Sequence, residues 1–288
     1  MKKILIPVDF SEYSYAAVEY ACQIISTNQS QQELDLLHVY TNHSNLYVNR
    51  DLDPDIVDPQ IEISEREMAK LIEIVGQKHP GIQTNALYRN GNLFEETSKV
   101  TANFPYDAVL MGTKGSSGIE AVFLGSNTYD VILNTKTPVL GIPKEATKFK
   151  KQRVGLLTNF KEAEIEVLAQ AINLIGGDFE LMLIHINKDD QDIRIIDEKF
   201  KTWIDYIVER SGINDISYHV KSRALYNKAV ENISHAINNV IIDEQIDIIL
   251  VTKSRKSFFR KLISENIVRK MAYNITTPTF FARVHATK

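Results

Sequence analysis

The chain has 288 residues, of which 44% are hydrophobic and 24% charged, a composition typical of globular proteins and sufficient for two modest cores. This composition argues against a disordered or fibrous protein. Because the sequence has no apolar run of bilayer length and no signal-peptide pattern, we expect no membrane interaction and a cytoplasmic location. The single cysteine, Cys22, lies on an apolar helical face and is expected to fill the core.

Charge is distributed unevenly along the chain, whose net charge is −4. Residues 1–145 contain 11 basic and 19 acidic side chains, whereas residues 146–288 contain 22 basic and 18 acidic ones. The two halves are therefore expected to face different neighbours. Neither half is basic enough to indicate nucleic-acid binding.

Short β-branched apolar runs alternate with amphipathic segments through the first half. The pattern predicts strands at 3–9, 34–40, 82–89, 107–112 and 138–142, with helices at 12–27, 60–79, 92–103 and 125–134 between them. Runs that are apolar enough to be buried on both faces indicate a parallel sheet covered by helices. The acidic segment 52–59 is expected to be a long surface connection, with a lid over a ligand as the alternative.

The same order of elements is repeated in the second half. Strands are predicted at 153–159, 179–186, 215–223, 246–252 and 278–284, with helices such as 190–211 and 227–243. The fold class is therefore α/β: two tandem, doubly wound, parallel five-stranded sheets with helices on both faces. We expect one domain at 1–146 and a second at 150–288.

The stretch "GTKGSSGIEAVFLGSNT", which begins at the end of the predicted fourth strand of the first half, contains four glycines, three of which form a spaced pattern. Gly112, Gly115 and Gly125 come after a buried strand, and Ser126, Asn127 and Thr128 open the next predicted helix. Glycines let an anion approach the main chain, and a helix start offers unpaired N–H groups. The combination favours a phosphate site over an ordinary glycine-rich loop, although it is neither a P-loop nor a dinucleotide-binding pattern.

The spacing G-x2-G-x9-G-[ST], together with "ILIPVDFSEYS" and "LLHVY" near the start, resembles the universal stress protein family, in the arrangement of a tandem member. The resemblance implies an adenine nucleotide alpha-hydrolase-like fold, with the two copies packed as a pseudo-dimer through their last strands. It also implies a bound ATP, or ADP or AMP, together with Mg²⁺, in the first copy.

The resemblance further implies a role for each of a set of residues. Asp9 would meet the nucleoside, the backbone of Val39 would bind the adenine edge, and the glycines with the first helical turn would hold the phosphates. The full cofactor-binding set is Pro7, Val8, Asp9, Val39, Met111, Gly112, Lys114, Gly115, Gly125, Ser126, Asn127 and Thr128. Structural alternatives remain open: Asp9 as a helix cap, Val39 as a core residue and Lys114 as a solvated side chain.

The second copy departs from this pattern. With a constant offset of 140 residues, Thr252, Arg255 and Glu265 stand where the first copy has Gly112, Gly115 and Gly125. In the alignment of 3–12 with 153–162, Asn159 stands where the first copy has Asp9. A glutamate at the phosphate position would repel the ligand, so we expect no nucleotide in this half. The basic loop 253–261 is expected to be a solvated face, with a site for an anion or an acidic partner as the alternative.

The sequence favours a regulatory ATP-binding protein that acts through contacts with a protein partner. The alternatives are an interaction scaffold with a relic loop and a weak ATPase. No catalytic residue is identified, since neither an aspartate pair nor a positioned base is apparent, and His38 and His185 occupy equivalent places that suggest structural roles. Closed two-fold pairing is compatible with a further homodimer of chains.

Overall fold

The computed structural model describes residues 2–28, 32–40, 59–113, 126–187, 191–222, 233–253 and 277–283. The first half has five strands and four helices in the described part of the chain. In order they are β1 (Lys2–Pro7), α1 (Glu12–Asn28), β2 (Gln32–Tyr40), α2 (Pro59–Lys78), β3 (Gln83–Asn90), α3 (Leu93–Asn103), β4 (Ala108–Thr113), α4 (Ser126–Asn134) and β5 (Val139–Pro143). These elements match the predicted order.

The second half repeats this order. Its elements are β6 (Arg153–Leu157), α5 (Ala163–Ile175), β7 (Glu180–Asn187), α6 (Ile193–Ser211), β8 (Ile216–Ser222), α7 (Ile233–Asp243), β9 (Ile248–Lys253) and β10 (Thr279–Arg283). Strands β1 and β6 each end two residues earlier than predicted. The reason is a turn in which Phe10 and Phe160 adopt φ angles of 61° and 59°, which an extended strand cannot accommodate.

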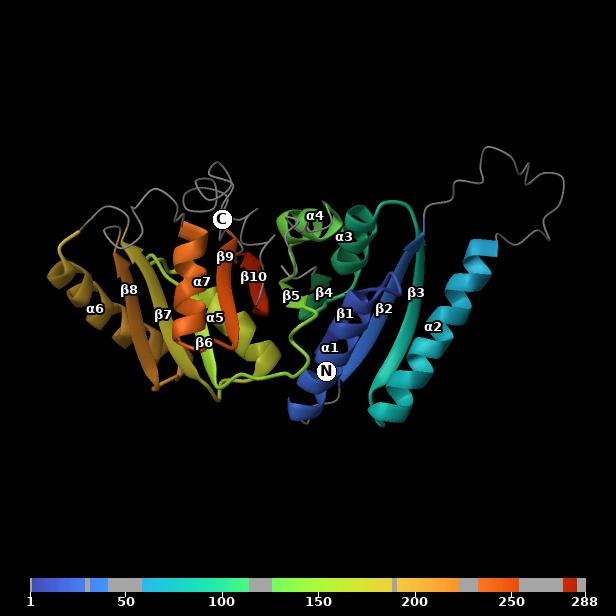
Figure 1. Ribbon diagram of the computed structural model, residues 1–288, viewed down its shortest axis with the longest axis horizontal. Coiled ribbons are helices and arrows are strands. Elements are labelled where there is room, and N and C mark those ends of the chain that lie inside the picture. Colours follow the sequence, from blue (N-terminus) through green and yellow to red (C-terminus); the bar gives the residue numbers. More distant parts are fainter. Residues whose placement is uncertain are drawn as a thin grey trace.

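The ten strands form one sheet in the order β3-β2-β1-β4-β5-β10-β9-β6-β7-β8. Within each half neighbouring strands are parallel. Strands β5 and β10 are antiparallel, with Leu140 opposite Phe280. The predicted pairing through the last strands is therefore confirmed, and it makes the two five-stranded sheets continuous around a pseudo-two-fold axis (Figure 1).

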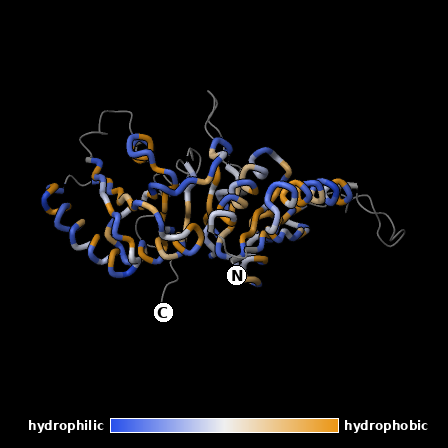
Figure 2. Tube along the Cα trace, turned by 90° about the horizontal axis from the view of Figure 1, so that it is seen from below, coloured by the Kyte–Doolittle hydropathy of each residue, from blue (hydrophilic) through white to orange (hydrophobic). Residues whose placement is uncertain are grey.

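Helices cover both faces of this sheet. Successive side chains of a strand point to opposite faces, and both sets are apolar here, so both faces must be covered. On one face Ile4 and Ile6 pack against α1 and α2, and the corresponding strands of the second half pack against α5 and α6. On the other face Leu5 and its neighbouring strands in the first half pack with α3 and α4, and the strands of the second half pack with α7. Figure 2 shows the resulting alternation of hydrophobic and hydrophilic stretches along the helices.

Side chains cap several helices where the hydropathy pattern alone gives only an approximate end. Asn92 and Asp192 accept hydrogen bonds from the backbone amides of Phe94 and Arg194, which fixes the starts of α3 and α6. Gly212 ends α6 with a φ angle of 73°, in the left-handed region that glycine tolerates. Because Asp192 caps α6, this helix begins at Ile193, three residues after the predicted start at residue 190.

The segment between the two halves packs against α1. The Phe149 ring lies edge-on to Tyr20, with ring centroids 5.5 Å apart, and the Phe149 amide donates to Gln23 Oε1 at 2.6 Å. A second contact joins the two halves directly, because Asn173 of α5 donates to Asp107 Oδ1 at 2.7 Å. These contacts fix the two halves beside the β5–β10 pair.

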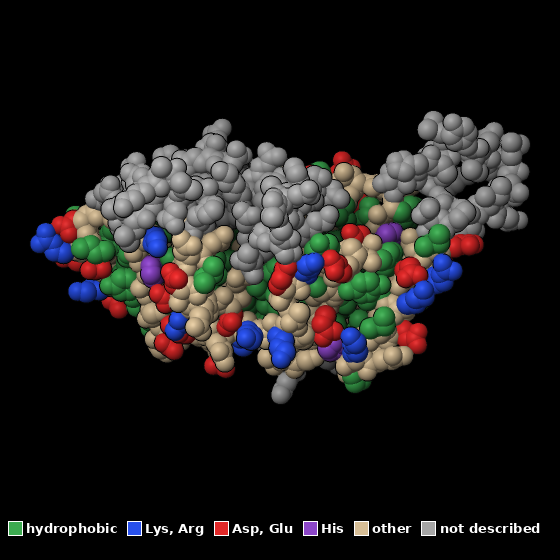
Figure 3. All heavy atoms as spheres, viewed as in Figure 1, with side chains coloured by type: hydrophobic (Ala, Val, Ile, Leu, Met, Phe, Trp, Pro, Cys, Tyr) green, Lys and Arg blue, Asp and Glu red, His purple; other side chains and the backbone are tan. Residues whose placement is uncertain are grey.

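Figure 3 shows acidic and basic side chains interspersed on the described surface of one face. Among the described helices, none is long and apolar enough to cross a membrane. Cys22 is fully buried, and burial raises the pKa of its thiol to about 12. This setting agrees with the predicted packing role.

Candidate functional site

A cavity of about 210 Å³ lies where β1, β2 and β4 end and where α1, α3 and α4 begin. Ligands of doubly wound α/β domains bind at this edge, beyond the carboxyl ends of the strands. The cavity is lined by Pro7, Val8, Asp9, Ser11, Tyr13, Ser14, Val39, Leu93, Met111, Gly112 and Thr128. Seven of these residues belong to the set that the sequence predicts for a nucleotide.

One wall of the cavity is apolar. Val8 and Met111 are nearly fully buried, and Val39 packs against the same cluster as Met111. The volume is smaller than the roughly 300–1,000 Å³ of pockets for drug-sized ligands. The space therefore suits one ring system better than a complete nucleotide.

Asp9 lies at the exposed rim, between the end of β1 and the start of α1. Its Oδ1 accepts hydrogen bonds from the Ser11 amide at 3.1 Å and the Ser11 hydroxyl at 2.6 Å. Desolvation by itself would raise the pKa of Asp9, but the hydrogen bonds from Ser11 outweigh it and hold this pKa below its ordinary value. Asp9 is therefore a carboxylate at neutral pH, and its bonds to Ser11 support the turn before α1.

Gly112 has a packing role in addition to its place in the cavity wall. A Cβ at this position would lie 2.1 Å from the backbone oxygen of Tyr13. Only glycine allows α1 to pack this closely on β4. The first of the three glycines is therefore explained by helix–strand packing as well as by ligand approach.

Helix α4 brings its first turn to the cavity, where Thr128 is buried and contributes to the lining. The positive end of the helix dipole is at this terminus. Ser126 and Asn127 lie in the same turn, although their side chains are outside the described part of the structure. Lys114, Gly115 and Gly125 fall within 114–125, which also lies outside the described residues.

Four lining residues were not predicted from the sequence: Ser11, Tyr13, Ser14 and Leu93. Leu93 begins α3 directly after the turn that follows β3, so the rule that ligands lie beyond strand ends could have identified it. The other three lie in or next to the first turn of α1. Their approach to β4 depends on Gly112 and has no local signal in the sequence.

The equivalent place in the second half is filled differently. Glu164, which corresponds to Ser14, is buried, and its carboxyl oxygens accept from the Thr158 hydroxyl at 2.5 Å and the Asn159 amide at 2.8 Å. Desolvation raises the pKa of Glu164 to about 7, in opposition to these hydrogen bonds. Its side chain occupies the turn where the first half has its cavity.

The two histidines have the same setting in both halves. His38 Nδ1 lies 2.9 Å from the Val8 oxygen, and His185 Nδ1 lies 3.0 Å from the Thr158 oxygen. Each ring also packs on the phenylalanine of the preceding turn, Phe10 or Phe160. Because both halves have this contact, it indicates a structural role for the histidines in the strand-to-helix turn.

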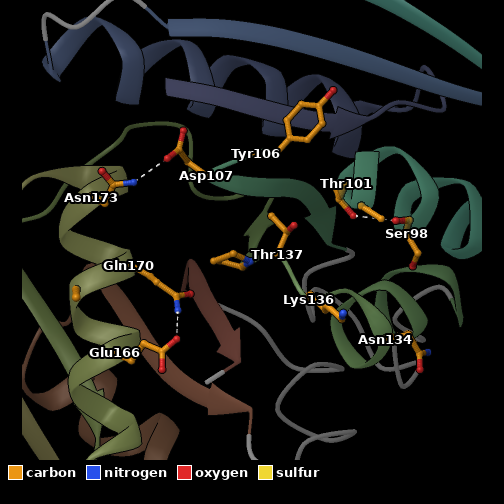
Figure 4. A pocket seen from close by; sticks show the side chains of 13 residues that line it. Ser98, Thr101, Tyr106, Asp107, Asn134, Lys136, Thr137, Glu166, Gln170 and Asn173 are labelled. Atoms are coloured by element: carbon orange, nitrogen blue, oxygen red, sulfur yellow. Dashed lines mark hydrogen bonds between the residues drawn. The ribbon is translucent and has the colours of Figure 1, made fainter. Parts of the chain in front are cut away.

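A larger cavity, of about 900 Å³, lies between the two halves (Figure 4). It is bounded by α3 and the segments before β4 and β5 on one side, and by the Gln170 and Asn173 region of α5 on the other. This space lies at the amino ends of β4 and β5, away from the predicted residues. Its position makes the smaller cavity the better candidate for the nucleotide.

Part of the basic loop 253–261 is described, and here one expectation is wrong. Lys253 is only 3% exposed, so it does not belong to a solvated face. The remaining residues of that loop, together with Glu265 and the segment 52–58, lie outside the described residues. Within the described ranges, no group of three or more histidine, cysteine, aspartate or glutamate side chains is arranged to hold a metal ion.

Residues 1–143 match the model of the universal stress protein family. The chain belongs to the universal stress protein family. A universal stress protein of Bacillus subtilis, YxiE, is 26% identical over 146 residues, which cover 48% of this chain and 96% of that protein.

Another relative, the universal stress protein MJ0531 of Methanocaldococcus jannaschii, is 24% identical over 50% of this chain and 82% of its own length. The crystal structure of a universal stress protein from Archaeoglobus fulgidus matches the whole chain, with a TM-score of 0.68 at 19% identity and coverage of 99% and 97% of the two chains. The curated relatives thus cover about half of this universal stress protein, and the solved structure shows the same fold over both halves, as in a tandem member.

Proposed function

We propose that the first half binds one adenine nucleotide, preferentially ATP, and that the bound nucleotide regulates contacts with a protein partner. The proposal rests on the cavity at the carboxyl ends of β1, β2 and β4, which brings seven predicted residues together beside the first turn of α4. An apolar wall and a helix N-terminus in one site match the two chemically different ends of a nucleotide.

In this proposal each part of the nucleotide is assigned to one part of the site. The adenine would lie against Val39 and Met111, and the ribose hydroxyls would donate to the Asp9 carboxylate, which is ionised at neutral pH. The phosphates would extend out of the small cavity toward the start of α4 and residues 114–125. Mg²⁺ would be held mainly by phosphate oxygens and water, as is common for this ion.

One nucleotide per chain is expected because the equivalent turn of the second half holds a buried carboxyl group. Glu164 places a buried carboxyl group against Thr158 and Asn159, whereas the first half has the small side chain of Ser14 at the corresponding point. A ligand there would have to displace Glu164 and its hydrogen bonds.

The direct experiment is to denature the purified protein and quantify released nucleotide, followed by titration of the ligand-free protein with ATP, ADP and AMP. We expect about one equivalent per chain, corresponding to one open cavity. Two equivalents would contradict the assignment to the first half alone. No bound nucleotide and no binding in the titration would favour the scaffold function.

A substitution that copies the second half into the first tests the location. Ser14→Glu should place a carboxylate in the cavity and weaken ATP binding by about tenfold or more, through occupied space and like-charge repulsion. Ser14→Ala is the matched control, because it keeps the cavity open and removes only the hydroxyl. Equal ATP affinity in the Ser14→Glu variant and the wild type would place the nucleotide elsewhere.

A further inference from the structure

Two basic residues of the second half reach across the junction to the end of α4. Lys253 Nζ donates to the backbone oxygens of Ile132 at 3.0 Å and Thr135 at 3.3 Å. Arg283 donates from a terminal guanidinium nitrogen to the Leu133 oxygen at 3.0 Å. Three carbonyl groups at the C-terminal end of this helix are therefore bound by side chains that lie more than a hundred residues away in the sequence.

The carbonyls at a helix C-terminus lack intrahelical partners and form the negative end of the dipole. Helix α4 has no basic residue of its own in the last turn. Lys253 and Arg283 therefore supply from the second half the hydrogen-bond donors that α4 does not supply for itself, and Arg283, together with Lys253 in its protonated form, supplies positive charge.

The placement of Lys253 is energetically demanding, which argues against an incidental contact. Its side chain is almost fully buried; burial, followed by the charge of Arg283, lowers its pKa to about 7. Carbonyl acceptors at the negative end of a helix offset part of this cost. Without α4 in place, these donors would lose the partners that make their burial tolerable.

The residues of the first half that are equivalent to Lys253 and Arg283 cannot make the same contact. Lys253 and Arg283 lie opposite each other at the ends of β9 and β10, and the corresponding pair at the ends of β4 and β5 is Thr113 and Pro143. Neither side chain carries a charge, and Pro143 has no side-chain donor. The second half holds a helix of the first half through this pair, and the first half cannot return the contact through the equivalent residues.

We propose that Lys253 and Arg283 are positioning residues of the nucleotide site, held on the half of the chain that lacks that site. Helix α4 has nine residues and is about 13 Å long. Its first turn lines the cavity through Thr128, and its last turn is held by the basic pair. Because α4 is so short, holding its C-terminal end also fixes the direction in which the amides of its first turn point.

The consequence rests on the proposed nucleotide function and concerns the phosphates in particular. The apolar wall formed by β1, β2 and β4 does not depend on the α4 anchor, so the base and ribose should bind without it. The phosphates face the start of α4 and should bind less well when the helix is free to tilt. The anchor is therefore expected to affect ATP and to leave adenosine unaffected.

The experiment compares the wild type with Lys253→Met and with the double variant Lys253→Met/Arg283→Met. Methionine fills the buried space without charge, so the fold should be retained. Lys161→Met, at an exposed position of the second half, is the matched control for the loss of a positive charge. The first readout is amide hydrogen exchange of residues 126–134 without ligand, and the second is the Kd for ATP and for adenosine.

We expect faster exchange in α4 for Lys253→Met, a Kd for ATP that is about threefold to tenfold higher, and an unchanged Kd for adenosine, with larger changes in the double variant. Unchanged exchange in both variants would overturn the anchor. Faster exchange with ATP and adenosine affected equally, or with neither affected, would overturn its link to the phosphates. If the wild type itself binds no ATP, the proposed function fails, and the exchange of α4 still decides whether the anchor exists.

Discussion

The two halves of this protein share one topology and differ at the point where a ligand would enter. In the first half, Gly112 lets α1 pack closely on β4, Ser14 has a small side chain, and both residues line a cavity at the carboxyl ends of the strands. In the second half, Thr252 and Glu164 stand at these positions, and the Glu164 carboxyl group occupies the turn. Among the described residues, a few side chains at one strand-to-helix turn distinguish the two halves without changing the fold.

The largest effect is expected from Gly112→Ala. Its new Cβ would meet the Tyr13 backbone oxygen, which cannot move without shifting α1, so the free energy of unfolding should fall by about 3 kcal/mol. Denaturant unfolding followed by circular dichroism measures the change. Thr252→Ala is the matched variant in the second half and should cost about 1 kcal/mol or less, because the buried Thr252 hydroxyl has no hydrogen-bond partner among the described residues. Similar losses in the two variants would refute the proposed difference in helix packing.

A smaller effect, confined to the second half, is expected from Glu164. Its pKa rises from an ordinary 4.5 to about 7 in the folded protein, so between these values the folded state holds a proton that the unfolded chain has lost. Its contribution to stability is therefore fully present below pH 4.5 and is lost as the pH rises toward 7. The free energy of unfolding should be about 1–3 kcal/mol higher at pH 5 than at pH 7.5.

The single tryptophan, Trp203, lies in α6 and reports unfolding of the second half by its fluorescence. Glu164→Gln should remove most of this pH dependence, because an amide cannot ionise. The pH series is therefore run on both proteins with the same fluorescence signal. A Gln variant that retains the full slope would assign the dependence to another group.

Two contacts at the junction between the halves, one aromatic and one polar, should contribute unequally to stability. Phe149→Ala removes a partly buried ring from Tyr20 and should lower the unfolding free energy by about 1–2 kcal/mol. Asn173→Ala removes one exposed hydrogen bond to Asp107 and should cost about 0.5 kcal/mol. Thermal unfolding of both variants shows which contact contributes more to stability. A larger loss for Asn173→Ala would mean that the hydrogen bond to Asp107 stabilises the junction more than the Phe149 ring does.

The sequence predicts the order and type of the described elements because apolar periodicity is a local property, and the internal repeat fixes the equivalence of the two halves. It also identifies seven residues of the cavity, since strand ends and a known family pattern mark the edge of the sheet. Ser14 and Glu164 could not be identified as counterparts with opposite effects, because their roles depend on how closely each helix approaches its sheet.

The burial of Lys253 could not be predicted from the sequence. In the sequence it begins a run of basic residues, and such runs are usually solvated. In the fold it is buried against Ile132 and Thr135, which are more than a hundred residues away. No local pattern encodes this contact, because it exists only after β5 and β10 have paired.

The antiparallel pairing of β5 with β10 has a consequence for symmetry. In a homodimer joined through this edge, a two-fold axis would repeat every contact, so a lysine that holds one helix would have to appear on both sides. Here the two edges belong to one polypeptide and need not be identical. The covalent connection through residues 144–152 keeps the geometry of a symmetric dimer while releasing each half to change independently. Residues of one half can then change to bind a ligand, and residues of the other half can change to hold a helix of the first.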